Sequence, residues 1–163
     1  MIFILFISFI LLLRIAELFL SKENEKWLLQ NGAVEYGKKH YSLIVALHTL
    51  FFISLIIEYT TQQTPSYSVF ILLFYFLLLV FKGWIFASLG KFWNTKIFRI
   101  PNFPLIKTGP YKYVKHPNYI VVVAEIALIP LAFHLYYTAI IFSLLNVIIL
   151  SIRIKEENRA LEI

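Results

Sequence analysis

The sequence predicts an all-α integral membrane protein with about five transmembrane helices, and three observations support this fold class. The 163 residues are 60% hydrophobic, with a mean hydropathy of +0.78. The apolar residues gather in long runs that are separated by short polar segments, and Lys and Arg are concentrated in only some of those segments. A soluble domain of this length could not cover so much apolar surface.

The apolar runs give the predicted spans in chain order. They are residues 1–20, 43–57, 67–89, 119–135 and 136–152. The first run would extend roughly 30 Å as a helix, about the thickness of the hydrocarbon core. It has neither the basic start nor the small-residue cleavage site of a signal peptide, so it is predicted to be a retained span.

The remaining segments connect these spans. Residues 21–39 are charged and contain Trp27, which predicts an interfacial segment, and residues 60–66 form a short uncharged turn. Residues 153–161 predict an amphipathic helical tail after a C-terminal helical hairpin. We expect residues 1–163 to form a single membrane domain, with residues 1–66 as its N-terminal part and residues 67–163 as its second part.

The basic residues indicate an orientation. Segments 21–40, 82–115 and 153–159 together contain all but one of the 15 Lys and Arg residues, the exception being Arg14. With five spans, these segments fall on one side of the membrane, which the positive-inside rule identifies as the cytoplasm. The N-terminus is therefore predicted outside and the C-terminus in the cytoplasm. In a membrane protein this excess of positive charge concerns orientation and anionic lipids, so nucleic acid is not expected as a partner.

Four ionisable residues lie within or near the apolar spans: Arg14, Glu17, His48 and Glu125. Each would cost at least ~2.5 kcal/mol in hydrocarbon, so each should face a partner or a wet cavity. Arg14 and Glu17 are three residues apart and could simply pair on one helix face. Glu125 has no partner nearby in sequence, which favours a cavity role. His48 could be a ligand-binding residue or an ordinary hydrogen-bonded interior histidine. The chain has no cysteine, and no His/Glu spacing predicts a metal site.

The polar stretch from residue 107 to residue 119 is the strongest candidate for a functional loop. Gly109 and Pro110 predict a turn, and Pro117 suits the first turn of the next helix. The free backbone N–H groups of that helix would favour an anion. Tyr111, Tyr113 and Tyr119 offer aromatic faces for an adenine ring or a cation. The alternative is an interfacial belt of Lys and Tyr residues that only anchors the loop.

Two motifs carry a resemblance to a known family. "GPYKYVKHPNY" at 109–119, followed by a helical hairpin and "RIKEENRAL" at 153–161, resembles the isoprenylcysteine carboxyl methyltransferase family. Its members are integral membrane enzymes that methylate lipid-attached acceptors with S-adenosylmethionine. The resemblance covers about residues 89–161, which makes residues 67–163 the catalytic half. "RIAEL" and "NEKW" in the N-terminal half resemble the small bacterial branch, which implies a bacterial cell membrane.

The resemblance implies roles for individual residues. The cofactor-binding residues would be Phe103, Pro104, Leu105, Ile106, Tyr111, His116, Pro117, Asn118, Tyr119 and Glu157. Arg153 would bind the acceptor, and Arg153 and Glu157 would be the catalytic residues. Glu17, His48 and Glu125 are expected to line an acceptor tunnel. The chain departs from the family pattern at Lys115, where Arg is usual, and at Val121, where Gly is frequent.

These residues predict an S-adenosylmethionine-dependent O-methyltransferase with a lipid-like acceptor. A carboxylate acceptor needs no general base. An acceptor with an enol or phenol hydroxyl, such as an alkyl-pyrone or another polyketide lipid, would benefit from one, and the candidates are His40, His48 and His116. Two alternatives stay open at this point. One is a nicotinamide-dependent membrane reductase of the sterol reductase type, which has a similar loop, and the other is a non-enzymatic small membrane subunit.

Overall fold

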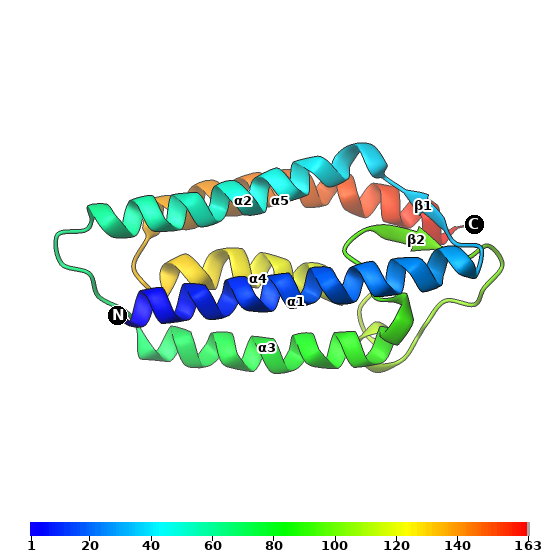
Figure 1. Cartoon of the computed structure of the whole chain (residues 1–163), viewed down its shortest axis with the longest axis horizontal. Coiled ribbons are helices and arrows are strands. Elements are labelled where there is room, and N and C mark those ends of the chain that lie inside the picture. The colour runs from blue at the N-terminus through cyan, green and yellow to red at the C-terminus, as the bar shows by residue number, and fades with distance from the viewer. Residues whose placement is uncertain (163) are drawn as a thin grey trace.

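The computed structural model describes residues 1–162, which form five α-helices and two short β-strands (Figure 1). The helices are α1 (Ile2–Gln30), α2 (Lys38–Thr61), α3 (Val69–Leu89), α4 (Pro117–Leu131) and α5 (Tyr136–Leu161). The strands are β1 (Val34–Tyr36) and β2 (Ile97–Arg99), and the 3₁₀ helices are η1 (Gly90–Phe92) and η2 (Gly109–Lys112). The predicted all-α membrane fold is confirmed.

Four of the helices in this range, α1, α2, α3 and α5, are long and apolar enough to cross a membrane. Helix α4 is apolar but has only 15 residues, which is about 22 Å of helix against a hydrocarbon core of roughly 30 Å. It ends near Pro130, and a tight turn in which His134 has φ of 56° leads into α5. The fourth predicted span (119–135) therefore exists as a short helix packed between longer ones, and the fifth (136–152) lies within the long helix α5.

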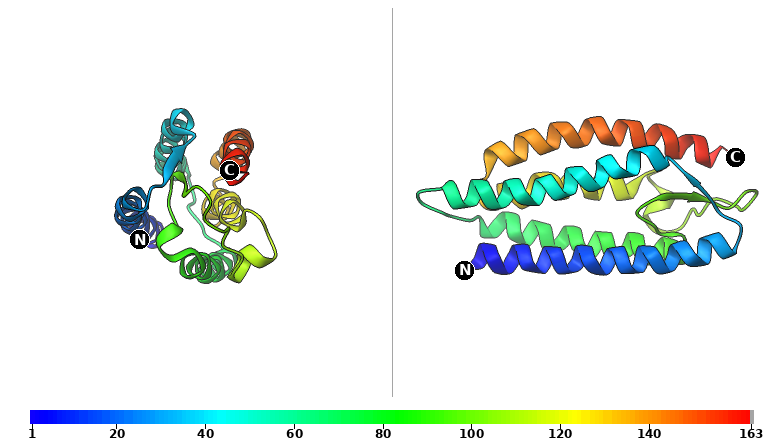
Figure 2. Two further views of the ribbon diagram at one scale, coloured as in Figure 1. Left: turned by 90° about the vertical axis from the view of Figure 1, so that its right-hand side faces the viewer. Right: turned by 45° about the horizontal axis from the view of Figure 1, so that its top comes forward.

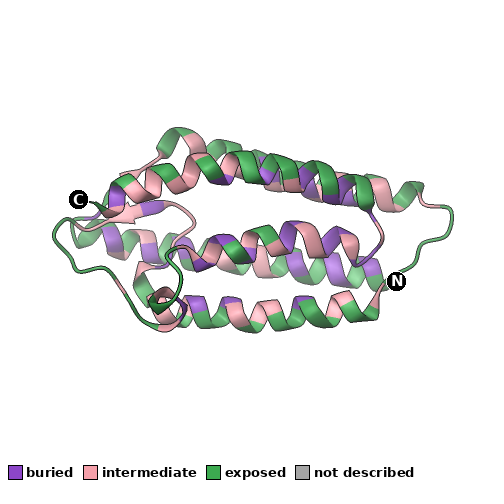
Figure 3. Ribbon diagram, turned by 180° about the vertical axis from the view of Figure 1, so that it is seen from behind, coloured by how far each residue is buried: buried purple, intermediate pink, exposed green. Residues whose placement is uncertain are grey.

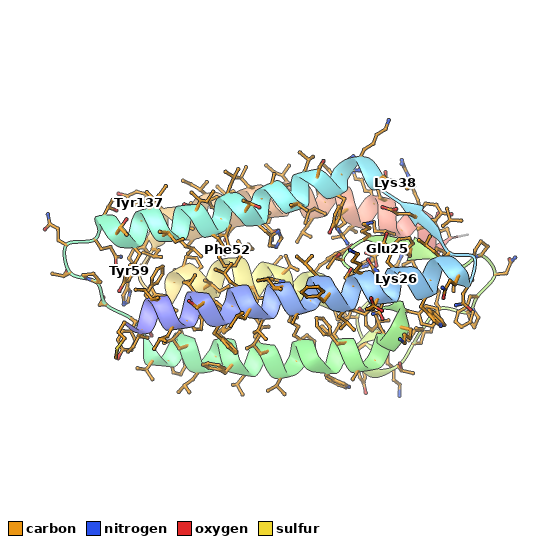
Figure 4. The ribbon with its side chains drawn as sticks, in the orientation of Figure 1. Glu25, Lys26, Lys38, Phe52, Tyr59 and Tyr137 are labelled. Carbon is orange, nitrogen blue, oxygen red and sulfur yellow. The ribbon has the colours of Figure 1, made fainter. Side chains whose placement is uncertain are left out.

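Successive helices run in alternating directions, so the connections fall at two ends of the bundle (Figure 1). The α2–α3 and α4–α5 turns lie at the same end as the N-terminus. The strands, the loop between η1 and α4, and the end of α5 lie at the opposite end, which we call the loop end. In Figure 4, Glu25, Lys26 and Lys38 are at the loop end, while Tyr59 and Tyr137 are at the other.

Two features at the loop end differ from the prediction. Residues 21–30, predicted as part of an interfacial segment, continue α1 without a break until Asn31 and Gly32, where Gly32 adopts φ of 78°. The strands β1 and β2 were not predicted, because three residues are too few to reveal an alternating pattern. They pair antiparallel, with Glu35 opposite Phe98. This small sheet joins the α1–α2 connection to the α3–α4 connection.

Seen end-on, α4 lies between α3 and α5, and α2 packs beside α5 (Figure 2). The core is rich in aromatic and branched side chains. Its largest fully buried members include Phe51, Leu55, Tyr75, Ile126 and Phe133. Exposed residues occur along the helices (Figure 3). Apolar residues such as Phe70 and Val80 are among the exposed ones, which suits contact with lipid chains.

Polar contacts hold the end opposite the loops. The Glu58 carboxylate accepts backbone hydrogen bonds from Tyr137 (3.1 Å) and Thr138 (2.7 Å). A carboxylate at this position satisfies free N–H groups of α5 and opposes the positive end of its dipole. The Gln62 amide donates to the carbonyls of Phe133 and His134 at 3.2 Å. These contacts fix the start of α5, and with it the direction of the helix that carries Arg153 and Glu157.

Candidate active site at the loop end of the bundle

The segment after η1 is attached to α1 by buried hydrogen bonds. The side-chain amide of Asn24 donates to the Trp93 carbonyl at 2.7 Å. Ser21 Oγ accepts from the backbone N–H of Thr95 at 3.1 Å, and the Ser21 carbonyl accepts from the Asn94 amide at 2.8 Å. Ser21 and Asn24 are both buried. Segment 93–95 is thereby held in one position beneath the loop.

The loop turn at Gly109 packs against the end of α3. Gly109 has φ of 53°, and a Cβ there would lie 1.9 Å from Ser88 Oγ. Only glycine combines this backbone conformation with so close an approach. Pro110, which follows it, is buried, and Thr108 Oγ donates to the Ser88 carbonyl at 3.2 Å. The turn directs Tyr111 inward, while Tyr113 is 76% exposed.

Helix α4 begins at Pro117, as predicted, and His116 precedes it as the N-cap residue. The His116 ring stacks on Tyr119, with ring centroids 5.4 Å apart. His116 Nε2 lies 3.0 Å from Asn158 Oδ1, and Nδ1 lies 3.3 Å from Glu157 Oε1. These contacts attach the start of α4 to the last turns of α5.

Tyr119 connects the two predicted catalytic residues. Its hydroxyl donates to the Glu157 carboxylate and accepts from Arg153 Nε at 3.0 Å. Arg153 Nη2 also donates to the Thr95 carbonyl at 2.5 Å. Arg153 and Glu157 are one turn apart on α5, so both face the start of α4. The structure brings together Tyr119, Arg153 and Glu157, which are up to 38 residues apart in sequence.

Three neighbouring cavities surround this group. We call them the outer, middle and inner pockets, with volumes of about 230, 100 and 100 Å³. Tyr111 and Glu157 line both the outer and the middle pocket. Tyr119 and Arg153 line both the middle and the inner pocket. The three pockets therefore follow one another from the loop end into the helical bundle, with Glu157 between the outer two and Arg153 between the inner two.

The outer and middle pockets contain most of the predicted cofactor-binding residues. Those that line the outer pocket are Phe103, Pro104, Leu105, Ile106, Tyr111 and Glu157, and those that line the middle pocket are Tyr111, His116, Asn118, Tyr119 and Glu157. Pro117 is buried and lines neither pocket. Lys115, where the chain departs from the family pattern, lines the outer pocket, whereas Val121 is fully buried in a cluster with Ile85 and Trp93.

Sequence reasoning did not assign Trp93 and Lys96 to the site, although both line the middle pocket. Trp93 Nε1 is buried and lacks a hydrogen-bond partner within residues 1–162. Buried N–H groups are nearly always paired, so this indole suits a bound ligand. The sequence offered a weak signal for Trp93 in the Trp-Asn-Thr run that leads into the loop.

The inner pocket lies among the helices and is mostly apolar. Its polar lining includes Arg14, Glu17, His48, Lys82 and Asn146. Glu17 and His48 were predicted to line a tunnel here, and both line this pocket. Sequence reasoning missed Asn146.

Glu125 is not among the residues that line the inner pocket, contrary to the expected cavity position. It is 1% exposed and belongs to a cluster of four charges. Arg14 donates to Glu17 at 2.8 Å and to Glu125 at 2.5 Å, and Lys82 pairs with both carboxylates. Lys82, which the sequence grouped with the basic end segments, is therefore buried in the bundle. The predicted pairing of Arg14 with Glu17 is confirmed.

Electrostatics at the loop end follow from these contacts. The close contact with the Glu157 carboxylate raises the pKa of His116 above its ordinary value of 6.5. Burial raises the pKa of the Tyr111 hydroxyl, so this tyrosine stays neutral. The hydrogen bond to Glu25 raises the pKa of Lys96, which keeps its positive charge beside the middle pocket.

The chemistry of the middle pocket suits a small charged organic ligand with an aromatic ring. Glu157 offers a carboxylate, Lys96 and Arg153 offer cations, and Tyr111 offers an aromatic face. Within residues 1–162, no group of three His, Asp or Glu side chains is arranged to hold a metal ion. The outer and middle pockets together fall in the range of roughly 300–1,000 Å³ that is usual for small-molecule sites.

Comparison with known proteins identifies the family. The model of the isoprenylcysteine carboxyl methyltransferase (ICMT) family matches residues 69–163. The chain is 41% identical to "Uncharacterized protein YpbQ" of Bacillus subtilis over 162 residues, covering 98% of this chain and 96% of the relative. It is 31% identical to an "Uncharacterized protein" of Haemophilus influenzae over 158 residues, covering 93% and 90% of the two chains. No solved structure is a significant match. The family model, the nearly full-length relatives and the geometry of the loop end agree: the chain belongs to the ICMT family.

Proposed function

We propose that the chain is an S-adenosylmethionine-dependent O-methyltransferase that acts on a carboxylate or hydroxyl of a lipid-like acceptor. The observation that carries this proposal is the position of Arg153 and Glu157. They lie one helical turn apart and are bridged by Tyr119, where a polar pocket at the loop end meets an apolar pocket within the bundle. A soluble cofactor and a lipid could therefore approach one point from two directions.

The cofactor is assigned to the outer and middle pockets. Glu157 would accept hydrogen bonds from its ribose or amino group, and Tyr111 would contact the adenine or the sulfonium through an aromatic face. Lys96 and the backbone N–H groups at the start of α4 favour its carboxylate. Trp93 Nε1, buried without a partner among the described residues, would gain one.

The acceptor is assigned to the inner pocket. Its mostly apolar walls come from α2, α4 and α5, and it reaches Arg153 on the side that faces the loop end. The bonds from Arg153 to Thr95 and Tyr119 leave three N–H groups of the guanidinium unused. Those groups could orient an acceptor oxygen by charge-assisted hydrogen bonds.

When bound, the cofactor would supply a methyl group on a sulfonium sulfur. The acceptor oxygen would form a bond to the methyl carbon as the carbon–sulfur bond breaks, and S-adenosylhomocysteine would leave. Arg153 would hold that oxygen in line, and the surrounding apolar side chains would exclude water. A carboxylate acceptor has no proton to lose. A hydroxyl acceptor must transfer its proton to a base: His116 lines the middle pocket and His48 the inner pocket, whereas His40 lines a separate small cavity.

We also propose a single membrane domain in a bacterial cell membrane, with the N-terminus outside and the C-terminus in the cytoplasm. The basic segments at the loop end support this orientation. The chain has no cysteine, so a single cysteine at exposed Gln63 or exposed Lys112 is the only thiol. A membrane-impermeant maleimide should label Gln63→Cys in intact cells and should leave Lys112→Cys unlabelled until the cells are opened.

The activity test incubates purified protein in membranes with methyl-labelled S-adenosylmethionine and a total bacterial lipid extract. We expect label in an organic-soluble product: a base-labile product indicates an ester and a base-stable one an ether. Arg153→Ala should abolish the transfer, while Lys155→Ala, an exposed charge on the same helix, should retain it.

Binding separates the proposal from its alternatives. The protein should bind S-adenosylhomocysteine in isothermal titration, and Glu157→Gln should weaken that binding. Binding of NADPH without S-adenosylhomocysteine would instead identify a reductase. If neither nucleotide binds and no lipid fraction is methylated, the result would instead identify a non-enzymatic membrane subunit.

A further inference from the structure

We propose that the inner pocket recognises a second polar group of the acceptor, and that Asn146 is the residue that binds it. The acceptor would then be an amphiphile with an amide or hydroxyl group between its methylated oxygen and its hydrocarbon tail. This inference rests on the proposed function, because it takes Arg153 as the site of the methylated oxygen.

Asn146 lies in the middle of the apolar part of α5. Its side chain is 2% exposed and lines the inner pocket. Within residues 1–162 the amide makes no hydrogen bond, although other buried polar side chains of the bundle, such as Thr138 with Ser54 at 2.8 Å, are paired. A carboxamide in the interior of the bundle without a hydrogen-bond partner is unfavourable. An amide aimed into a cavity therefore points to a ligand.

Two further side chains bring hydrogen-bonding groups to the same pocket. His48 Nδ1 lies 2.8 Å from the Ile44 carbonyl. A carbonyl can only accept, so Nδ1 carries the proton and Nε2 of the neutral ring is left as an acceptor. The Arg14 guanidinium, held on one side by Glu17 and Glu125, keeps 23% of its side chain exposed and adds donors.

The lining thus combines acceptors, from Nε2 of His48 and Oδ1 of Asn146, with donors from Arg14 and the Asn146 amide. Glu17 and Lys82 also line the pocket and pair with each other. A group that both donates and accepts satisfies this set best, which favours an amide or a hydroxyl. A methylene chain satisfies none of it. A site built to hydrogen-bond a polar group discriminates strongly against an analogue that lacks it, because its own buried groups are then left unpaired.

The position of the second group follows from α5. Asn146 and Arg153 are seven residues apart and line the same pocket, so they share one face of the helix. Two turns correspond to about 10 Å along the axis, and the long Arg153 side chain shortens the gap between the functional groups. The second polar group should therefore be a few bonds from the methylated oxygen, on the side away from the loop end.

The test uses a series of probes with the same acyl tail that differ in the presence of an amide and in its distance from the carboxylate. Palmitic acid has the carboxylate alone. N-palmitoyl glycine, N-palmitoyl β-alanine and N-palmitoyl γ-aminobutyrate carry an amide at increasing distance from the carboxylate. Dissociation constants are measured on the detergent-solubilised full chain, with and without saturating S-adenosylhomocysteine.

We expect one spacing to bind about tenfold more tightly than palmitic acid, which is the effect of one good hydrogen bond. Asn146→Leu should reduce that preference to less than twofold, because it removes the amide that palmitic acid leaves unpaired. Thr138→Val, a matched loss of a buried polar group on α5 away from the pocket, should lower thermal stability but preserve the spacing preference.

The inference is overturned if no probe binds more tightly than palmitic acid to the wild-type chain. It is also overturned if Asn146→Leu weakens all four probes equally, which would assign the amide a structural role or a bound water. Failure of the proposed function is a separate result, since it appears as a lack of S-adenosylhomocysteine binding in a pocket that Asn146 does not line.

Discussion

The Tyr119 hydroxyl accepts a hydrogen bond from Arg153 Nε at 3.0 Å and donates one to Glu157. Tyr119 stands at the start of α4, and its two partners are on α5, so one phenol holds the two helices in register at the site. The residue proposed to orient the acceptor is thereby linked to the residue proposed to bind the cofactor.

Replacing Tyr119 with phenylalanine should slow methyl transfer by about tenfold or more. Arg153 would keep the hydrogen bond from Nη2 to the Thr95 carbonyl but would lose the one from Nε to the Tyr119 hydroxyl. A hydrogen bond to a charged group is worth about 1.5–3 kcal/mol. The measurements are the transfer rate at saturating cofactor and the dissociation constant of S-adenosylhomocysteine. Tyr113→Phe, at an exposed position in the same loop, is the control. An unchanged rate in Tyr119→Phe would show that the hydroxyl does not position Arg153.

The four-charge cluster predicts a coupled effect on stability. Glu125→Gln leaves Lys82 and Arg14 short of negative charge in a buried setting, which should cost about 3 kcal/mol. The double substitution Lys82→Met/Glu125→Gln removes one charge of each sign and retains the pair of Arg14 with Glu17. It should therefore be more stable than Glu125→Gln alone.

Thermal unfolding in detergent measures both variants. Lys26→Ala, which breaks an exposed ion pair with Glu23, should change the free energy of unfolding by less than about 0.5 kcal/mol. Additive losses in the double variant would contradict the coupling.

Gly109→Ala should weaken the binding of S-adenosylhomocysteine by at least about tenfold. A Cβ at this position collides with Ser88 and the backbone has positive φ, so the loop must move away from α3, taking Tyr111 with it. Gly83→Ala is a matched control, because a Cβ there meets open space and alanine favours a helix. Equal affinities in the two variants would mean that the turn does not shape the pocket.

The contact of His116 with Glu157 predicts a dependence of stability on pH. The pKa of His116 is raised in the folded chain, chiefly by its close contact with the Glu157 carboxylate. The stabilisation is therefore fully present below the ordinary pKa of 6.5 and is lost as the pH rises through the raised value. The wild-type midpoint of thermal unfolding should fall by a few degrees over this range relative to His116→Gln. Parallel curves for the two chains would exclude the ion pair.

The helices and their order could be predicted from the sequence because each apolar run is long and the connections contain helix-breaking residues. Pro117 indicates the start of α4, because proline lacks the backbone N–H that the first helical residue would leave unpaired. Asn31 and Gly32 indicate the end of α1. Residues 21–30 were predicted as part of a separate interfacial segment because they are charged, whereas they continue α1. A helix whose polar side chains lie beyond the apolar region can continue without interruption.

The partners of Glu125 could not be predicted in the same way. Arg14 and Lys82 are 111 and 43 residues away in sequence, and no local spacing relates three different helices. Arg14 and Glu17 were predictable because three residues separate them on one helix. Asn146 was missed for a related reason. The sequence shows a single amide in an apolar run but does not show which side chains of other helices lie near it.

The attachment of segment 93–95 to α1 has a consequence for how this chain can be divided. The family model begins at residue 69, yet the Thr95 carbonyl that receives Arg153 is positioned by Ser21, far outside the matched region. A hybrid chain built by grafting residues 69–163 onto another N-terminal half would keep every residue proposed to touch the cofactor, together with Arg153 and Asn146 of the acceptor pocket. It would still lose the support beneath Arg153 unless counterparts of Ser21 and Asn24 came with the graft.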